Sequence, residues 1–155
     1  MKRLVSAVCS YLALSLLWLL HFLPLPALRR VGHVLGVLLF LCARTRREIA
    51  RKNLRLCFPE WSKAEQERVL RRHLIVFAQS LLDRSIFWWG RRTRLERLIH
   101  LKGEEFLCRQ DGCPTLLLAP HFVGLDAGGV AVAFRLPVVS VYSHQKNPVF
   151  NAVFL

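Results

Sequence analysis

An uncharged apolar run near the N-terminus constrains the fold of this chain more than any other feature. The run begins at Leu4 and ends at Leu28, and two prolines interrupt it near its end. Its first part, Leu4–Leu23, has about twenty residues, which is enough for one helix to cross the hydrocarbon core of a bilayer. No clear cleavage site follows, so we expect residues 1–28 to be a retained membrane anchor that spans the bilayer or lies in its interface.

A second apolar segment and a strongly basic segment follow this run. Val31–Ala43 is too short to span a bilayer, and we expect a helix packed on the first one or buried in the core. The next dozen residues predict a basic helix, which anionic headgroups attract at about 1 kcal/mol per basic residue near the surface. A plain solvated helix face is the alternative. The basic residues are Arg44, Arg46, Arg47, Arg51, Lys52 and Arg55.

The charge of the chain is large and uneven. Its 155 residues are 54% hydrophobic and include 23 basic and 10 acidic residues, for a formal net charge of +13. So high an apolar content excludes an intrinsically disordered protein. The charge suits an anionic membrane surface, an acidic substrate or nucleic acid. All basic residues except Arg135 and Lys146 precede Asp111, so the C-terminal part is nearly neutral.

The middle of the chain predicts a long helix after a turn at residues 58–61. Ser62 with Glu65 three residues later is a capping-box pattern for the start of this helix. Apolar residues then recur at helical spacing, and we expect them to form the buried stripe of the helix. They are Leu70, Leu74, Phe77 and Leu81.

From residue 98 the pattern changes to that of an α/β fold with a mostly parallel sheet. Short apolar runs bounded by turn residues predict buried strands, and the segments between them predict helices. Asn147 and Pro148 then predict a further helix start. We expect three parts: an anchor (1–28), a helical basic region (29–97) and the first part of an α/β catalytic domain (98–155). The expected strands are Leu98–Lys102, Thr115–Ala119 and Pro137–Tyr142, and the expected helices are Glu104–Gln110 and Leu125–Phe134.

A histidine and a carboxylate at the end of one predicted strand are the best candidates for chemistry. His121 follows the strand, and Asp126 opens the next helix five positions later. A carboxylate beside an imidazole stabilises the tautomer that removes a proton, and the cation that then forms. Only a loop between strand and helix brings the two together, and we expect Gly124 to supply the freedom for that loop. The alternative is a chance spacing with a histidine satisfied in the core.

The five cysteines predict no disulfide framework, because their number is odd and the chain lacks a compact secreted design. Cys108 and Cys113 with His121 are conceivable metal ligands. The spacing and the missing fourth ligand argue against zinc, so we expect no metal.

At three separated places the chain resembles the lipid A biosynthesis acyltransferases, the lauroyl/myristoyl branch of the lysophospholipid acyltransferase superfamily. These places are the segment 53–60 (Asn-Leu-Arg-Leu-Cys-Phe-Pro-Glu), the His121–Asp126 pair, and Val141-Tyr142 followed by Asn147-Pro148. The resemblance covers the whole chain but only the first half of a typical family member. We therefore expect an N-terminal fragment of a longer enzyme or a truncated gene product.

The resemblance implies a transferase at the bacterial inner membrane with its active site facing the cytoplasm. Such enzymes move a fatty acyl chain from acyl carrier protein to a hydroxyl of a lipid A precursor, without a cofactor. His121 matches the general base and Asp126 the acidic residue that orients it. The expected partners are acyl carrier protein, the lipid A precursor and anionic membrane lipid, but not nucleic acid. The expected substrate-binding residues are Phe122, Gly124, Tyr142 and Asn147.

Two other functions remain open. The first is a membrane-anchored basic protein that binds anionic lipid or nucleic acid without catalysis, which leaves the His121–Asp126 spacing unexplained. The second is an acyltransferase that acts on another lipid, such as a glycerolipid.

Overall fold

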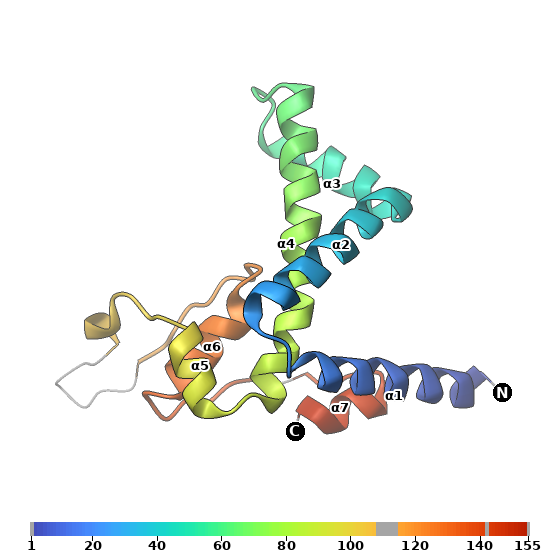
Figure 1. The fold of residues 1–155 in the computed structure, drawn as a ribbon. Helices are drawn as coiled ribbons and strands as arrows, with labels where there is room; N and C mark the ends of the chain where they lie inside the picture. The colour runs from blue at the N-terminus through green and yellow to red at the C-terminus, as the bar shows by residue number, and fades with distance from the viewer. Residues whose placement is uncertain (1, 108–114, 142, 155) are drawn as a thin grey trace. The chain divides into compact units, whose positions relative to one another are not determined.

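The computed structural model describes residues 2–107, 115–141 and 143–154, and in these ranges every regular element is a helix (Figure 1). The elements are α1 (Lys2–Leu20), α2 (Leu25–Cys42), α3 (Arg44–Cys57), α4 (Lys63–Trp89), α5 (Arg92–Leu98), the 3₁₀ turn η1 (Glu104–Phe106), α6 (Leu125–Ala133) and α7 (Pro148–Phe154).

The predicted α/β fold is therefore wrong for the described residues. Thr115–Ala119 and the described part of Pro137–Tyr142 are irregular, and Leu98–Lys102 consists of the last residue of α5 and the loop after it. Leu116 is 97% exposed and Val139 is 99% exposed, whereas a strand inside a parallel sheet buries both faces. A strand exists only through hydrogen bonds to a neighbour, and an apolar run does not specify that neighbour.

The chain divides into two compact units. One comprises Leu23–Arg84, with α2, α3 and most of α4. The other comprises Met1–Phe22 and Ser85–Leu155, with α1, the end of α4, and α5, α6 and α7.

In the first unit, α2 packs closely on α4 through two glycines. A Cβ atom on Gly32 would lie 2.9 Å from the Cα atom of Gln79, and one on Gly36 would lie 2.4 Å from the Cα atom of Ile75. Both distances are shorter than real Cβ contacts, so the two helix backbones touch here. Leu28 lies one turn before Gly32 and is 1% exposed. The face of α2 that carries these residues is therefore the face packed on α4.

A polar contact adds to this interface. Gln79 Nε2 on α4 donates a hydrogen bond to the backbone oxygen of Arg29 at 3.0 Å. The Arg29 guanidinium pairs with Asp83 on α4 at 3.0 Å. Burial raises the pKa of Asp83, and Arg29 opposes this shift only in part.

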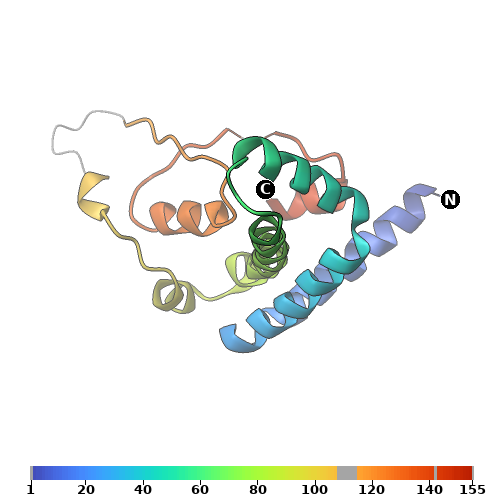
Figure 2. The same ribbon diagram turned by 90° about the horizontal axis from the view of Figure 1, so that it is seen from above.

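α2 and α3 meet at a bend at Ala43, which is clear in both ribbon views (Figures 1 and 2). Arg47 on α3 donates hydrogen bonds to the backbone oxygens of Phe40 and Leu41, two of the last carbonyls of α2. Its guanidinium also lies 5.2 Å from the centre of the Phe40 ring. A helix end leaves such carbonyls without intrahelical donors, so Arg47 stabilises both the end of α2 and the bend.

The predicted basic helix and the start of the long helix are confirmed. The basic helix is α3, and α4 begins after Ser62, whose Oγ accepts the hydrogen bond of the Glu65 backbone N–H at 3.2 Å. The predicted buried stripe of α4 is only half right, because Phe77 is 41% exposed. The observed buried stripe has one residue at every fourth position, and these residues lie on the face of α4 that is packed. Its members are Leu70, Leu74, Ala78, Leu82 and Ile86.

One described helix, α2, is long and apolar enough to cross a membrane by length and composition. It has 18 residues with a mean hydropathy of 1.5, and 17% of it is buried inside the structure. The second apolar segment is therefore longer than Val31–Ala43, because Pro24 serves as N-cap and Pro26 lies in the first turn. The apolar part of α1, Ser6–Leu20, is a shorter apolar helix.

Candidate active site

The candidate pair lies in the second unit, at the start of α6. His121 directly follows Pro120 in an irregular segment, and Asp126 is the second residue of α6. The turn between them is closed by two backbone hydrogen bonds, from Phe122 N–H to the Pro120 oxygen at 2.8 Å and from Leu125 N–H to the Phe122 oxygen at 3.1 Å. The predicted loop between His121 and the helix is confirmed, whereas the strand before it is absent from the described residues.

Both side chains of the pair are exposed, and so is that of Phe122 between them. The alternative was a histidine satisfied in the core. Such a histidine would be buried, so the exposure of His121 argues against this alternative. A catalytic base must be accessible to the hydroxyl whose proton it removes. The exposure of His121 meets that requirement, and its catalytic role stays a prediction.

Gly124 is the N-cap of α6, but its backbone does not need a glycine. Its φ of −91° and ψ of 9° are accessible to other residues. The expectation that this loop depends on glycine freedom is therefore wrong. A Cβ atom added at Gly124, Gly128 or Gly129 meets no described heavy atom within 4 Å. These glycines instead leave the N-terminal part of α6 without side-chain cover, so its backbone is approachable.

The N-terminus of α6 has the electrostatics of an anion site. The first N–H groups of a helix lack intrahelical acceptors, and the helix dipole adds partial positive charge there. Asp126 lies in this first turn, where a carboxylate is favourable. The same N–H groups are of the kind that stabilise an oxyanion during acyl transfer.

Two arginines that the sequence analysis did not single out position α6 at its other end. Arg92 on α5 donates a hydrogen bond to the Phe134 oxygen at 3.2 Å, and its guanidinium lies 4.8 Å from the centre of the Phe134 ring. Arg135 pairs with Glu104 of η1 at 2.6 Å and donates to the Ala131 oxygen at 3.0 Å. The sequence did contain a signal for the role of Arg135, because a basic residue just after a predicted helix, in a nearly neutral segment, is placed to interact with the end of that helix.

Asn147 caps α7 and links it to α1. Its Oδ1 accepts the Val149 N–H at 3.0 Å, and its Nδ2 donates to Ser10 Oγ on α1 at 2.7 Å. The predicted helix start is thus confirmed, and α7 lies beside α1 (Figure 1). Contact between Asn147 and substrate stays a prediction, and Tyr142 lies outside the described residues.

No group of three histidine, cysteine or acidic side chains that could hold a metal ion occurs within the described ranges. Cys108 and Cys113, the conceivable partners of His121, lie outside them. Cys9, Cys42 and Cys57 are free thiols.

A family model described as bacterial lipid A biosynthesis acyltransferase matches residues 2–155. The lipid A biosynthesis lauroyltransferase of Escherichia coli is 28% identical over 144 residues, which is 92% of this chain and 47% of that protein. A lipid A biosynthesis acyltransferase of Haemophilus influenzae is 28% identical over 131 residues, covering 83% of this chain and 42% of its own length. The palmitoleoyltransferase of E. coli is 27% identical, with 93% of this chain and 48% of that protein covered.

The chain thus spans just under half the length of these relatives. No solved structure matches it.

Proposed function

Because this chain belongs to the bacterial lipid A biosynthesis acyltransferase family, we propose that it carries the general base of an enzyme that acylates a lipid A precursor. The acyl donor is acyl carrier protein, and the acceptor is a hydroxyl of the precursor. The observation that carries this proposal is the family match over residues 2–155, combined with an exposed His121–turn–Asp126 arrangement at the start of α6.

His121 acts as the general base of the transfer. It takes the proton of the acceptor hydroxyl while the oxygen forms a bond to the thioester carbonyl carbon. Asp126 stabilises the imidazolium. When the tetrahedral intermediate collapses, the carbon–sulfur bond breaks and the imidazolium returns the proton to the departing thiolate. No acyl-enzyme forms in this scheme.

The uncovered N-terminus of α6 supports a second element of the mechanism. Negative charge develops on the carbonyl oxygen during attack, and backbone N–H groups near Gly124 are suited to stabilise it. Phe122 is 75% exposed beside this turn and provides an apolar contact for an acyl chain. Tyr142 and Asn147 complete the proposed substrate contacts.

We place the enzyme at the cytoplasmic face of the bacterial inner membrane, in contact with anionic lipid. Two observations support this location: the apolar helix α2, of which little is buried, and the net charge of +13. Trp18 at the end of α1 is of the residue type enriched at membrane interfaces. The same charge suits an acidic donor protein and a phosphorylated acceptor.

The test is a transfer assay with the complete protein that contains this sequence. Membranes carrying it are incubated with labelled acyl carrier protein thioester and a lipid A precursor. General-base catalysis contributes about 10²–10⁴-fold, so His121→Ala should lower the rate by that factor. His144→Ala, an exposed histidine elsewhere in the same unit, is the matched control and should retain transfer. Equal rates in His121→Ala and the control would refute the assignment.

A membrane-anchored basic binding protein is the second candidate, and the exposed basic residues of α3 favour it. It predicts binding to anionic vesicles without acyl transfer from any donor. A third candidate, a glycerolipid acyltransferase, predicts transfer to a glycerolipid acceptor in the same assay and none to the lipid A precursor.

A further inference from the structure

A groove of about 700 Å³ lies on the first unit, between α2 and α4. α2 contributes His33 and Phe40 to its lining, and α4 contributes arginines and aliphatic residues. All residues that line the groove belong to the unit that does not contain His121 and Asp126.

The side chains that line the groove carry a net positive charge. Arg71 and Arg72 line the groove, and neither has an ion-pair or hydrogen-bond partner among the described residues. Arg68 adds a third guanidinium, which pairs only weakly with Glu65 at 3.4 Å. Clustered arginines without carboxylate partners are a recognition feature for phosphate groups.

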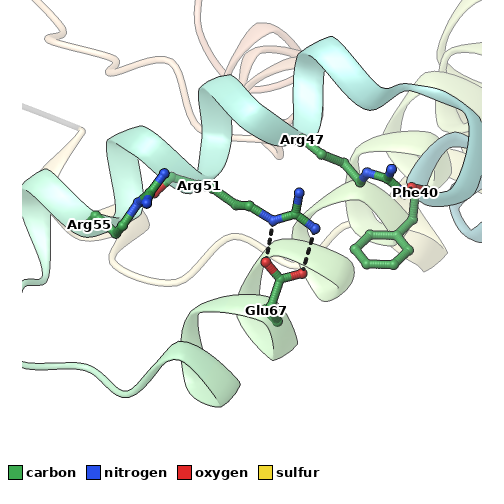
Figure 3. Close-up of polar contacts among 5 residues, drawn as sticks. All are labelled: Phe40, Arg47, Arg51, Arg55 and Glu67. Atoms are coloured by element: carbon green, nitrogen blue, oxygen red, sulfur yellow. Dashed lines mark hydrogen bonds and ion pairs between the residues drawn. The ribbon is translucent and has the colours of Figure 1, made fainter.

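The one carboxylate in the lining does not cancel this charge. Glu67 accepts hydrogen bonds from Arg51 of α3 at both of its oxygens, one of them at 3.0 Å (Figure 3). Because Arg51 neutralises Glu67, the charge of Arg71 and Arg72 remains available to a ligand.

The rest of the lining is apolar. Phe40, Ile75 and Val76 line the same groove, so it offers both a cationic and an apolar surface. Such a combination fits an anionic amphiphile better than a free anion, which gains nothing from apolar contact. A volume of about 700 Å³ lies in the range of pockets for a single drug-sized group, so it suits one headgroup with the start of its chain.

The outer face of α2 indicates where such a ligand comes from. On the side of α2 opposite Gly32 and Gly36, four large apolar side chains are between 41% and 61% exposed. An exposed apolar helix face beside a cationic groove is the arrangement of a protein surface at the headgroup level of a bilayer. The four residues are Val31, Val34, Leu38 and Leu41.

We propose that this groove binds the headgroup of one anionic membrane phospholipid, with Arg71 and Arg72 on the phosphate and Phe40, Ile75 and Val76 along the start of an acyl chain. The assignment rests on the membrane location proposed above, but not on acyl transfer. The net charge alone indicates only a general attraction to anionic lipid, whereas the groove is a defined binding site for it.

The experiment titrates dihexanoyl phosphatidylglycerol, a soluble short-chain lipid, into the full chain in neutral detergent and measures heat. The variant is Arg71→Gln with Arg72→Gln. The matched control is Arg46→Gln with Lys52→Gln, which removes the same charge from exposed positions of α3 outside the groove. We expect the dissociation constant to rise at least about tenfold in the variant and less than about twofold in the control.

A second variant guards against misfolding. Val76 is 38% exposed, so Val76→Glu places a carboxylate in the groove without burying it, and should also weaken binding about tenfold or more. Dihexanoyl phosphatidylcholine has the same chains and no net charge, and should bind at least about tenfold more weakly than phosphatidylglycerol. Circular dichroism should show unchanged helix content in all variants.

The proposal would be overturned if the two double variants weakened phosphatidylglycerol binding equally, or if the two lipids bound with equal affinity. It would also be overturned if inorganic phosphate bound as tightly as phosphatidylglycerol, or if an acidic protein bound at the groove and phosphatidylglycerol did not. His121→Ala should leave phosphatidylglycerol binding unchanged while transfer is lost. A failure of the lipid-binding proposal can therefore be distinguished from a failure of the transferase proposal.

Discussion

Arg51 on α3 binds Glu67 on α4 through both carboxylate oxygens, and this pair joins the basic helix to the long helix (Figure 3). The hydrogen bonds from Arg51 lower the pKa of Glu67. The two residues are 16 positions apart, so the pair is tertiary and not a contact along one helix.

Glu67→Gln should therefore lower stability slightly at pH 7, and the loss should disappear in acid. A carboxylate with a depressed pKa contributes stability above its unfolded value of 4.5, and this contribution is lost as the pH falls through the folded pKa. Denaturant unfolding at pH 7 and at a pH below the folded pKa, which itself lies below 4.5, measures the difference. Glu48→Gln, which breaks an exposed pair within α3, is the control and should have a smaller effect. An effect of Glu67→Gln that is independent of pH would contradict this account.

The ionised carboxylate of Asp83 should have the opposite effect on stability from that of Glu67. Burial raises the pKa of Asp83, and one of its oxygens, Oδ1, is buried without a hydrogen-bond partner in the part of the chain that the structure describes. A carboxyl group with a raised folded pKa costs stability when ionised, and this cost develops as the pH rises from 3.8 through the folded pKa. We expect Asp83→Asn to be as stable as the wild type or more stable at pH 7, and to flatten the decrease in stability with rising pH. A clear loss of stability at pH 7 would show that the Arg29 pair outweighs burial.

Gly36→Ala should destabilise the first unit. The added Cβ would lie 2.4 Å from the Cα atom of Ile75, a backbone atom that cannot move alone, so α2 and α4 must separate. Overpacking of this kind costs about 1–3 kcal/mol. Gly128→Ala is the matched control, because its Cβ meets nothing within 4 Å and alanine favours a helix by about 1 kcal/mol. Thermal unfolding of the two variants should shift in opposite directions, and a shift in the same direction would contradict the contact.

Asn147 should stabilise the second unit through its two hydrogen bonds. Asn147→Ala removes the cap of α7 and the bond to Ser10, and loss of an N-cap costs about 1 kcal/mol. Asn147→Asp keeps the capping oxygen and loses only the donor to Ser10, so it should retain about half of this stability. Hydrogen exchange of the α7 amides measures both. If Asn147→Asp also abolished acyl transfer while α7 stayed protected, its proposed contact with substrate would be supported.

Two helix starts could be predicted because their causes are local. Ser62 with Glu65, and Asn147 with Pro148, marked helix starts that the structure confirms, since a cap is a hydrogen bond within a few residues. The loop between His121 and α6 was predicted for the same reason. The family, too, followed from residues quoted in the sequence, and the match over 2–155 confirms it.

The predictions that failed concern partners distant in sequence. The apolar runs at Thr115–Ala119 and Pro137–Tyr142 have the composition of strands, but composition does not provide the hydrogen-bonding neighbour that makes a strand. The buried face of α4 was misjudged at Phe77 for a related reason, because helical spacing alone allows more than one face.

By itself the sequence determined the caps, the basic helix and the turn before Asp126, since each depends on neighbours along the chain. Only the tertiary structure decided that Gly36 lies against the Ile75 backbone and that Arg51 neutralises Glu67. It also left Arg71 and Arg72 without an ion-pair partner among the described residues. These outcomes depend on which helix faces which, and that choice is made by the burial of whole faces rather than by any local pattern.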